Sequence, residues 1–393
     1  MDFIRLHKDN DPRSLAFQKM PEGVNRIWAL QQIEGYQLAK KKLPQWAHLF
    51  AEGKDLHFPP HISMEQCSSE ATAKYKATLI NGQLLIDLTG GYGIDFSYMA
   101  PHFDRSIYVE KNKELYTIAK HNFGLLGLHN TEVVNADCEE FLSHHVGITP
   151  QTLIFLDPAR RDSAGGKVYR IEDCTPNLVM LQDSLLDIAH TVMVKLSPML
   201  DITQALRTLR NVSDVHIVSV KGECKELLFI MHREEPASLT YHCVNLETED
   251  EDFQYGTTSE PQYDNIQVCR HIVPGTMLFE PNASILKAGL QDSFSAHYGL
   301  RKLHPNSNLY IGNAPVNHVP ARQFRIVAIS DFSKLSLKNF LKDIKQANLT
   351  IRNFPSTVIQ LRQRLRIKEG GSDYLFATTL ADDSHVLIRC VKG

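Results

Sequence analysis

Short apolar runs recur along the middle of the chain, and segments with helical spacing of apolar residues separate most of them. Each run stops at a polar residue. We interpret the runs as strands at Leu84–Ile86, Ser106–Val109, Thr131–Asn135, Thr152–Leu156, Val192–Leu196, Val215–Val220 and Glu226–Met231. Strands that alternate with helices predict a mostly parallel sheet covered by helices on both faces.

The last two predicted strands differ from the others in their connection. Only residues 221–225, Lys-Gly-Glu-Cys-Lys, join them. This link is too short for the crossover that parallel strands need, so the two strands must be antiparallel. The predicted fold is therefore α/β, with a Rossmann-like sheet of seven strands of which the last is antiparallel.

Residues 1–76 precede the sheet and show apolar residues at helical spacing, such as Val24, Ile27 and Trp28. We predict an N-terminal helical segment over residues 1–76, followed by the sheet domain over residues 77–235. A helix is expected at Ala71–Leu79, directly before the first strand, with Ser68 or Ser69 as its cap.

The composition changes after about residue 235. The acidic run Glu247–Asp252 lies in a poorly periodic segment, which indicates a linker or an exposed loop, and Ala283–Leu290 predicts one helix. We assign residues 236–320 to a linker and a small subdomain. The tail over residues 321–393 predicts a compact α+β module. Its strands are expected at Phe324–Ile329, Leu349–Asn353, Tyr374–Leu380 and Val386–Val391, and its helices at Leu335–Ala347 and Thr357–Arg366.

Residues 84–95, with the sequence LLIDLTGGYGID, predict a strand, a tight glycine turn and the start of a helix. Glycine lacks the Cβ that would block close approach of a ligand, and the N–H groups of a helix start favour a polar or anionic group. We expect a nucleotide-like cofactor there. A dinucleotide fingerprint would need a third glycine where this chain has Phe96, so NAD is the weaker alternative.

Acidic residues follow the next strands as well. Glu110 ends the second strand, about 20 residues after the glycine turn, where an acid accepts hydrogen bonds from ribose hydroxyls. Asp137 follows the third strand, and Asp157 follows the fourth. Ligands of open α/β sheets bind outside the carboxyl ends of the strands, so these acids are expected to border the ligand.

The run from Asp87 to Gly93 resembles motif I of the class I S-adenosylmethionine-dependent methyltransferases, whose pattern is acidic-x-Gly-x-Gly-x-Gly. This chain departs from the pattern at Thr89, which stands at the first glycine. A final antiparallel hairpin is also typical of the sheet in that family. The resemblance implies S-adenosylmethionine as the cofactor and Asp137 as a residue beside its adenine. The cofactor-binding residues that it implies are Asp87, Thr89, Gly90, Gly91, Gly93, Asp95, Glu110, Lys111, Asp137 and Cys138.

The fourth strand ends in Asp157-Pro158-Ala159-Arg160, which resembles the Asp-Pro-Pro-Tyr motif of amino-methyltransferases. In those enzymes the acid accepts hydrogens from an exocyclic amine while an aromatic side chain stacks on the base. Asp157 and Pro158 match the motif, whereas Ala159 and Arg160 do not. Arginine can still stack on a base or bind a phosphate. The alternative is a strand that ends at a proline, with an arginine paired to Asp162.

The same residues also resemble the uracil C5-methyltransferases. Their chemistry needs a cysteine nucleophile at the end of the fifth strand, because C5 is unreactive until a thiolate adds to the ring. Here that strand ends in Lys195-Leu196-Ser197-Pro198, which favours methylation of an amine. Lys195 is expected to bind phosphate or to orient substrate, with a structural lysine as the alternative. The chain shows no zinc-type ligand spacing, and we expect no metal.

Charge is distributed unevenly over the 393 residues. Residues 321–393 hold 13 Lys and Arg against 6 Asp and Glu, although the whole chain has a formal net charge of -3. A basic module can gather a polyanion through its phosphates. The alternative is a solvated basic face. We find neither a signal peptide nor an apolar run near about 18 residues, so we expect a soluble, cytoplasmic protein without a membrane partner.

Taken over nearly its whole length, the chain resembles class I methyltransferases that carry a ferredoxin-like segment and a C-terminal THUMP-like domain. The resemblance rests on the motifs DLTGGYGID, DPARRD, KLSPMLD, KGECKELL and EPNASILKAGL. It places the ferredoxin-like segment within residues 236–320 and the THUMP-like domain at 321–393. THUMP domains bind RNA, so the resemblance implies methylation of an exocyclic amine in tRNA or rRNA. Two alternatives stay open: a methyltransferase for a small molecule or protein, and an RNA-binding protein that only senses the cofactor.

Overall fold

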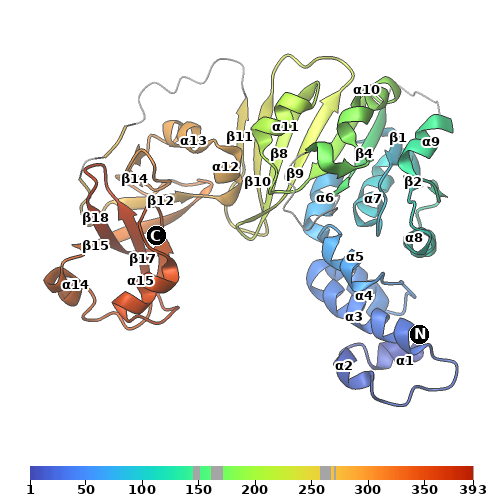
Figure 1. The fold of residues 1–393 in the computed structure, drawn as a ribbon, viewed down its shortest axis with the longest axis horizontal. Coiled ribbons are helices and arrows are strands. Elements are labelled where there is room, and N and C mark those ends of the chain that lie inside the picture. Colours follow the sequence, from blue (N-terminus) through green and yellow to red (C-terminus); the bar gives the residue numbers. More distant parts are fainter. Residues whose placement is uncertain (145–150, 161–170, 257–266, 270, 393) are drawn as a thin grey trace. The chain divides into compact units, whose positions relative to one another are not determined.

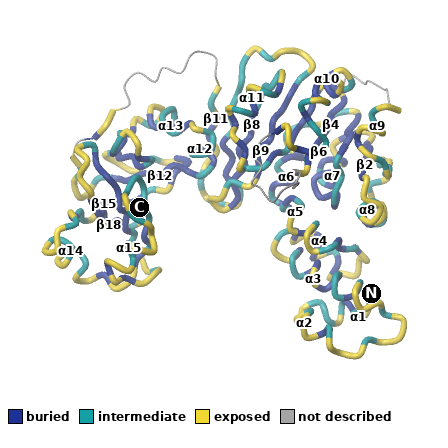
Figure 2. Tube along the Cα trace, viewed as in Figure 1, coloured by how far each residue is buried: buried dark blue, intermediate teal, exposed yellow. Residues whose placement is uncertain are grey.

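The computed structural model describes residues 1–144, 151–160, 171–256, 267–269 and 271–392 (Figure 1). Contacts along the chain divide it into two compact units, one of residues 1–215 and 226–239, the other of residues 216–225 and 240–393. Buried residues concentrate on the strands of both units (Figure 2). No helix in the described part of the chain is long and apolar enough to span a membrane.

The first unit begins with a helical segment, as the sequence predicts. Its helices are α1 (Asp2–Leu6), α2 (Pro12–Leu15), α3 (Arg26–Lys42), α4 (Pro44–Ala51) and α5 (His61–Gln66). The Asn25 side chain accepts a hydrogen bond from Trp28 N at 3.1 Å and so starts α3. Trp46 of α4 packs edge-on against Tyr92 with ring centroids 5.3 Å apart. Because Tyr92 belongs to the glycine turn, the packing of Trp46 against it supports the turn from one side.

The α/β part that follows belongs to the first unit, except for residues 216–225, which include the end of β8 and the start of β9. In chain order it contains α6 (Glu70–Leu79), β1 (Gly82–Asp87), α7 (Ile94–Met99), β2 (Phe103–Val109), α8 (Lys113–Leu126), β3 (Thr131–Val134), α9 (Cys138–His144), β4 (Thr152–Leu156), β5 (Ala159–Arg160), β6 (Cys174–Thr175), α10 (Leu178–Ile188), β7 (Thr191–Leu196), α11 (Ile202–Thr208), β8 (Val212–Val220) and β9 (Glu223–His232). All seven strands predicted from the sequence are therefore present.

The large sheet has the strand order β11-β10-β8-β9-β7-β4-β1-β2-β3. Pairing is parallel from β7 through β4, β1 and β2 to β3, whereas β9 pairs antiparallel with β7, as predicted. The predicted number of seven strands is too small, because the sheet formed by the described residues has nine. The additional strands are β10 (Thr240–Leu246) and β11 (Phe253–Gly256).

The two additional strands lie where the sequence indicated a linker. The acidic run Glu247–Asp252 is a loop, but it is the turn of a hairpin between β10 and β11. Asp252 closes this turn, since its Oδ1 accepts a hydrogen bond from Asn245 N at 2.7 Å. The short strands were missed because their burial depends on the neighbouring sheet, which no local pattern reveals.

The second unit contains a seven-stranded sheet in the order β13-β14-β12-β15-β18-β17-β16. Its strands are β12 (Met277–Pro281), β13 (Arg301–Lys302), β14 (Tyr310–Gly312), β15 (Ala321–Asp331), β16 (Asn348–Ile351), β17 (Tyr374–Thr379) and β18 (His385–Lys392). Its helices are α12 (Ala283–Ala288), α13 (Gln291–His297), α14 (Lys334–Phe340) and α15 (Val358–Leu365). Within residues 321–393 it contains the four strands and two helices that the sequence predicts for the tail, and the sheet also takes in β12, β13 and β14.

Two predicted helices of this unit end early. The helix expected at Ala283–Leu290 stops at Ala288, because Gly289 takes a left-handed conformation with φ +74° and caps it. The helix expected at Leu335–Ala347 stops at Phe340. Its apolar spacing continues to Ile344 and Ala347, but these two residues are buried in the core through turns that lead into β16.

Candidate active site

A cavity of about 800 Å³ lies in the first unit, at the carboxyl ends of β1, β2, β3, β4 and β7. The structure brings nearly all predicted site residues into its walls: Asp87, Thr89, Gly90, Gly91, Gly93, Asp95, Glu110, Lys111, Asp137, Cys138, Asp157, Pro158 and Lys195. Arg160 is the exception. Its backbone forms part of β5, but its side chain lies outside the described residues.

Two glycines of the turn are required by packing inside the unit itself. A Cβ on Gly90 would lie 2.3 Å from the ring of Tyr108, and one on Gly93 would lie 2.6 Å from the ring of Phe123. Gly91 and Gly93 also have positive φ, at +60° and +81°, which side chains disfavour. The sequence argument that glycine leaves room for a ligand is thus incomplete, since Gly90 and Gly93 leave room for aromatic rings.

Thr89 stands where the resembled family pattern has its first glycine. Its Oγ1 accepts a hydrogen bond from Asp157 N at 2.6 Å, and its own N–H donates to Asp87 Oδ1 at 3.0 Å. A glycine has no side chain for the first of these bonds. Thr89 therefore fastens the end of β1 to the end of β4, directly beside the candidate catalytic carboxylate.

Glu110 follows β2 and is held by two backbone donors. Its Oε2 accepts from Gly91 N at 2.7 Å, and its Oε1 accepts from Asn112 N at 2.6 Å. Each carboxylate oxygen can accept a further hydrogen bond. The predicted contact with ribose hydroxyls stays a prediction, and the structure gives a reason why the carboxylate would be oriented for it.

Asp137 and Cys138 lie at the start of α9. Asp137 is exposed, and its Oδ1 accepts a hydrogen bond from Glu139 N at 3.0 Å. Cys138 is buried, and burial together with Asp137 and Glu139 raises the pKa of its thiol to about 12. The thiol is therefore neutral at physiological pH and suits an uncharged wall of the cavity.

Asp87 ends β1 and has only 1% of its surface exposed. Burial raises its pKa well above the ordinary value for aspartate, and the nearby Asp95, Asp157 and Glu110 carboxylates add to the shift. The hydrogen bond from Thr89 N opposes the shift in part. Asp87 thus resists ionisation in the folded protein.

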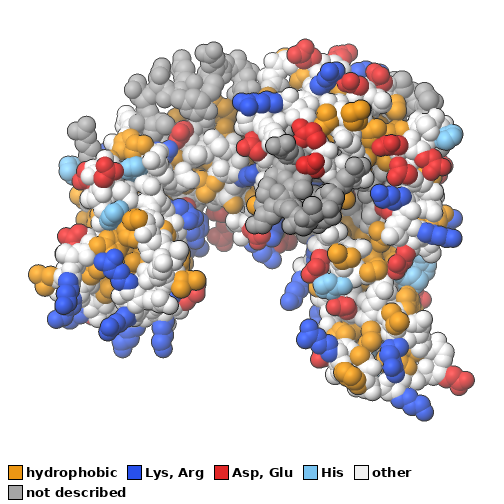
Figure 3. Space-filling model, in the orientation of Figure 1, with side chains coloured by type: hydrophobic (Ala, Val, Ile, Leu, Met, Phe, Trp, Pro, Cys, Tyr) orange, Lys and Arg blue, Asp and Glu red, His pale blue; other side chains and the backbone are white. Residues whose placement is uncertain are grey.

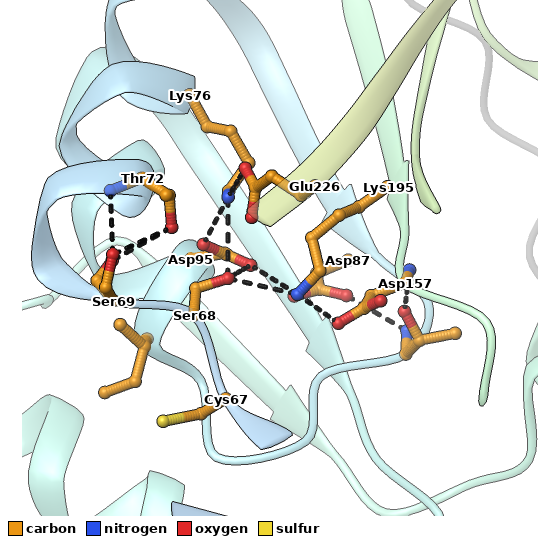
Figure 4. Close-up of polar contacts among 12 residues, drawn as sticks. Cys67, Ser68, Ser69, Thr72, Lys76, Asp87, Asp95, Asp157, Lys195 and Glu226 are labelled. Atoms are coloured by element: carbon orange, nitrogen blue, oxygen red, sulfur yellow. Dashed lines mark hydrogen bonds and ion pairs between the residues drawn. The ribbon is translucent and has the colours of Figure 1, made fainter. Parts of the chain in front are cut away.

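Lys195 of β7 is buried between two carboxylates (Figure 4). Its Nζ lies 2.5 Å from Asp157 Oδ2 and 3.6 Å from Asp95 Oδ2. Burial alone would lower the pKa of Lys195, but Asp157 and Asp95 outweigh burial, so the pKa is raised above that of an ordinary lysine. Lys195 therefore stays cationic and cannot act as a general base. Asp157 keeps 38% of its side chain exposed, toward the cavity that it lines.

A second lysine behind the cavity was not predicted from the sequence. Lys76 of α6 is fully buried, and its Nζ lies 3.1 Å from Asp95 Oδ1 and forms an ion pair with Glu226 of β9. Burial would raise the pKa of Asp95, but Lys76 and Lys195 outweigh it, so this pKa lies below the usual value. The buried side of α6 also holds Glu70, Thr72, Ala73 and Ala77, so no apolar stripe in the sequence marks this lysine as buried.

The N-terminal segment also supplies a wall that sequence reasoning missed. Ser63, Gln66, Cys67 and Ser68 line the cavity. Burial raises the pKa of the Cys67 thiol to about 11, so this thiol too is neutral at physiological pH. No local pattern of these residues marks them as part of a site, because they reach it only through the tertiary fold.

Known proteins resemble this chain in both sequence and structure. Two family models match the C-terminal part: a ferredoxin-like domain at residues 277–320 and a THUMP-like domain at residues 321–392. Uncharacterised S-adenosylmethionine-dependent methyltransferases of two Mycobacterium tuberculosis strains are 23% identical over 310 residues, which span 78% of this chain and 80% of theirs. The crystal structure of a candidate methyltransferase from Porphyromonas gingivalis is 34% identical, superposes with a TM-score of 0.86, and covers 100% of this chain and 97% of its own.

This chain belongs to the S-adenosylmethionine-dependent methyltransferases that carry THUMP-like and ferredoxin-like domains. The prediction of the family from its motifs is therefore confirmed, as is the α/β fold. S-adenosylmethionine is the cofactor of the methyltransferase. The individual residues that bind it stay predictions.

The cavity of the methyltransferase fits this cofactor in its chemistry. Apart from Asp87, whose ionisation is opposed by burial, its walls hold the acids Asp95, Glu110, Asp137, Glu139 and Asp157, against the lysines Lys111 and Lys195. This excess of acids suits a ligand that carries a sulfonium and an ammonium group. Leu88, Val109 and Leu115 add apolar surface that suits an adenine ring.

Proposed function

We propose that this methyltransferase methylates an exocyclic amine of a base in RNA. The observation that carries the proposal is the Asp157 carboxylate, which lies at the end of β4 and lines the same cavity as the glycine turn. When bound, S-adenosylmethionine supplies an electrophilic methyl group. Asp87, Glu110 and Asp137 would hold it, with the other cofactor-binding residues predicted from the sequence.

Asp157 is suited to bind an amine. Its Oδ2 is paired with Lys195, whereas none of the described residues forms a hydrogen bond to its Oδ1. Oδ1 can accept a hydrogen from the amine and so direct the nitrogen lone pair toward the methyl group. Asp157 can also take the proton that the amine loses once its nitrogen has been methylated. Pro158 and Arg160 are the proposed base-binding residues beside it, and Lys195 holds the carboxylate.

Two of the three cysteines that line the cavity, Cys67 and Cys138, support methylation at nitrogen rather than at pyrimidine C5, and the third is Cys174. A C5 mechanism needs a thiolate that adds to the ring. The raised pKa values of Cys67, about 11, and Cys138, about 12, keep both thiols neutral near pH 7. The end of β7 carries Lys195 where the C5 enzymes would have their cysteine.

RNA as the substrate is supported by the charge of the second unit. Lys and Arg side chains gather around its lower part in the space-filling view, over α14 and α15 (Figure 3). The exposed cations there are Lys334, Lys338, Lys342, Lys345, Arg364, Arg366 and Lys368. Such a surface attracts a polyanion and releases its counterions.

The test is transfer of labelled methyl from S-adenosylmethionine into a cell extract that is then separated into RNA, protein and small-molecule fractions. We expect label in RNA, lost in Asp157→Ala although S-adenosylhomocysteine still binds. RNA capture should weaken steeply as salt rises. Label in protein or small molecules would favour the first alternative. Cofactor binding without any transfer would favour a cofactor sensor, and normal turnover by Asp157→Ala would refute the role of this residue.

A further inference from the structure

The hydroxyl of Ser68 is the point at which two buried ion pairs meet (Figure 4). Its Oγ lies 2.6 Å from Asp95 Oδ2, 3.0 Å from Lys195 Nζ and 3.4 Å from Lys76 Nζ. A hydroxyl has one hydrogen to donate and two lone pairs to accept with. Ser68 donates to Asp95 and accepts from both lysines, so its capacity for hydrogen bonds is completely used. Only 7% of the residue is exposed.

These contacts fix the ammonium group of Lys195. It donates to Asp157 Oδ2 at 2.5 Å and to Ser68 Oγ at 3.0 Å, and it forms an ion pair with Asp95 Oδ2, which at 3.6 Å lies beyond hydrogen-bond distance. Ser68 is the uncharged partner among the three. Without it, the described residues hold the ammonium only through two carboxylates, which attract it in different directions. The position of the Asp157 carboxylate depends on the same ammonium.

We propose that Ser68 is a positioning residue for methyl transfer, whose hydroxyl holds the Lys195 ammonium against Asp157. Ser68 lies between α5 and α6, at the end of the N-terminal helical segment, and its neighbours Gln66 and Cys67 line the same cavity. Through Ser68, the N-terminal helical segment contributes directly to the active site. The inference rests on the proposed role of Asp157.

The chain offers a matched control in the adjacent serine. Ser69 Oγ accepts a hydrogen bond from Thr72 N at 3.3 Å and caps α6. Among the described residues, its side chain forms no hydrogen bond with Lys195 or Asp95. Ser69→Ala therefore removes a helix cap and leaves the ion pairs in place. Ser68→Ala removes the shared hydroxyl and leaves the cap. A purely structural role for Ser68 predicts that the two variants behave alike.

Steady-state kinetics with total RNA as acceptor gives the first readout. We expect Ser68→Ala to lower kcat by about tenfold, the effect of losing one hydrogen bond to a charged group, with unchanged affinity for S-adenosylhomocysteine. Ser68→Thr, which keeps a hydroxyl, should restore much of the rate. Ser69→Ala should lower the melting temperature and leave kcat unchanged. Equal kcat in wild type and Ser68→Ala, or equal losses in both serine variants, would overturn the inference.

The second readout needs no acceptor. In a protein labelled with ¹⁵N-lysine, buried and hydrogen-bonded ammonium groups exchange slowly and give ¹H–¹⁵N signals, and Lys195→Met assigns the signal of Lys195. We expect this signal to shift or broaden in Ser68→Ala and to remain in Ser69→Ala. A Lys195 signal that is identical in the wild type, Ser68→Ala and Ser69→Ala would refute the inference. If RNA accepts no methyl group while the signal behaves as expected, the proposed substrate fails and the positioning by Ser68 stands.

Discussion

Replacing Thr89 with valine removes one hydroxyl and keeps the shape of the side chain. In the wild type this hydroxyl accepts the hydrogen bond from Asp157 N at 2.6 Å. Valine leaves the N–H of Asp157 without an acceptor. This perturbation tests why the chain departs from the first glycine of the class I motif that it resembles, because the bond to Asp157 is the explanation that the structure gives.

The expected loss of folding stability follows from the surroundings of the bond between Thr89 and Asp157. Leaving a buried donor without a partner costs about 1–3 kcal/mol, and the partly exposed Asp157 places this site near the lower end of that range. Thr89→Gly should cost more, because it loses the same bond and adds about 0.5–1 kcal/mol of backbone entropy in the unfolded chain. Thr89→Ser keeps the hydroxyl and should remain close to the wild type.

Urea unfolding followed by tryptophan fluorescence measures the loss of unfolding free energy in the first unit, which contains Thr89. The protein has two tryptophans, Trp28 and Trp46, and both lie in the first unit. We expect the midpoint to fall in the order Thr89→Ser, Thr89→Val, Thr89→Gly, with kcat falling in the same order. A glycine variant that is as stable and active as the wild type would refute the reasoning.

Three further predictions concern the same unit. Gly90→Ala should destabilise it by about 1–3 kcal/mol because the new Cβ would lie 2.3 Å from the ring of Tyr108, whereas Gly124→Ala, in an open position of α8, should stabilise it by about 0.5–1 kcal/mol; urea midpoints check both. Glu110→Gln should weaken binding of S-adenosylhomocysteine in calorimetry, and an unchanged affinity would remove Glu110 from the cofactor site. Burial raises the pKa of Asp87, so the folded state holds its proton more tightly than the unfolded state, whose value is near 3.8, and stability from this residue is lost as pH rises above that value. The free energy of unfolding of Asp87→Asn, relative to wild type, should therefore increase with pH above about 4, and a constant difference would contradict the shift.

The sequence predicted the parts of the fold that depend on local patterns. A continuous apolar run that stops at a polar residue defines a buried parallel strand, which is why Thr152–Leu156 was predicted with the bounds that β4 has. The strands β10 and β11 escaped prediction because their apolar positions alternate weakly and become buried only beside other strands. The helix after Ser333 was predicted too long, because its apolar spacing continues into turns that bury Ile344 and Ala347.

The candidate site likewise contains residues that the sequence predicts and contacts that it does not. Strand ends mark the acids Asp87, Glu110, Asp137 and Asp157, so their meeting in one cavity followed from the order of the strands. The ion pairs behind the cavity could not be predicted from the order of the strands. Lys76 and Glu226 are 150 residues apart, and Ser68 and Lys195 are 127 residues apart, so no spacing in the sequence relates them. Their partnership appears only when α6 packs beside the sheet.

The central claim is methylation of a base nitrogen in RNA, and nucleoside analysis tests it most directly. RNA from a strain without this methyltransferase is treated with the enzyme and labelled S-adenosylmethionine, digested to nucleosides and separated by chromatography with mass detection. The account predicts that the label elutes with a nucleoside methylated on an exocyclic amine and that Asp157→Ala yields none. Label on a pyrimidine C5 or on ribose would contradict the account.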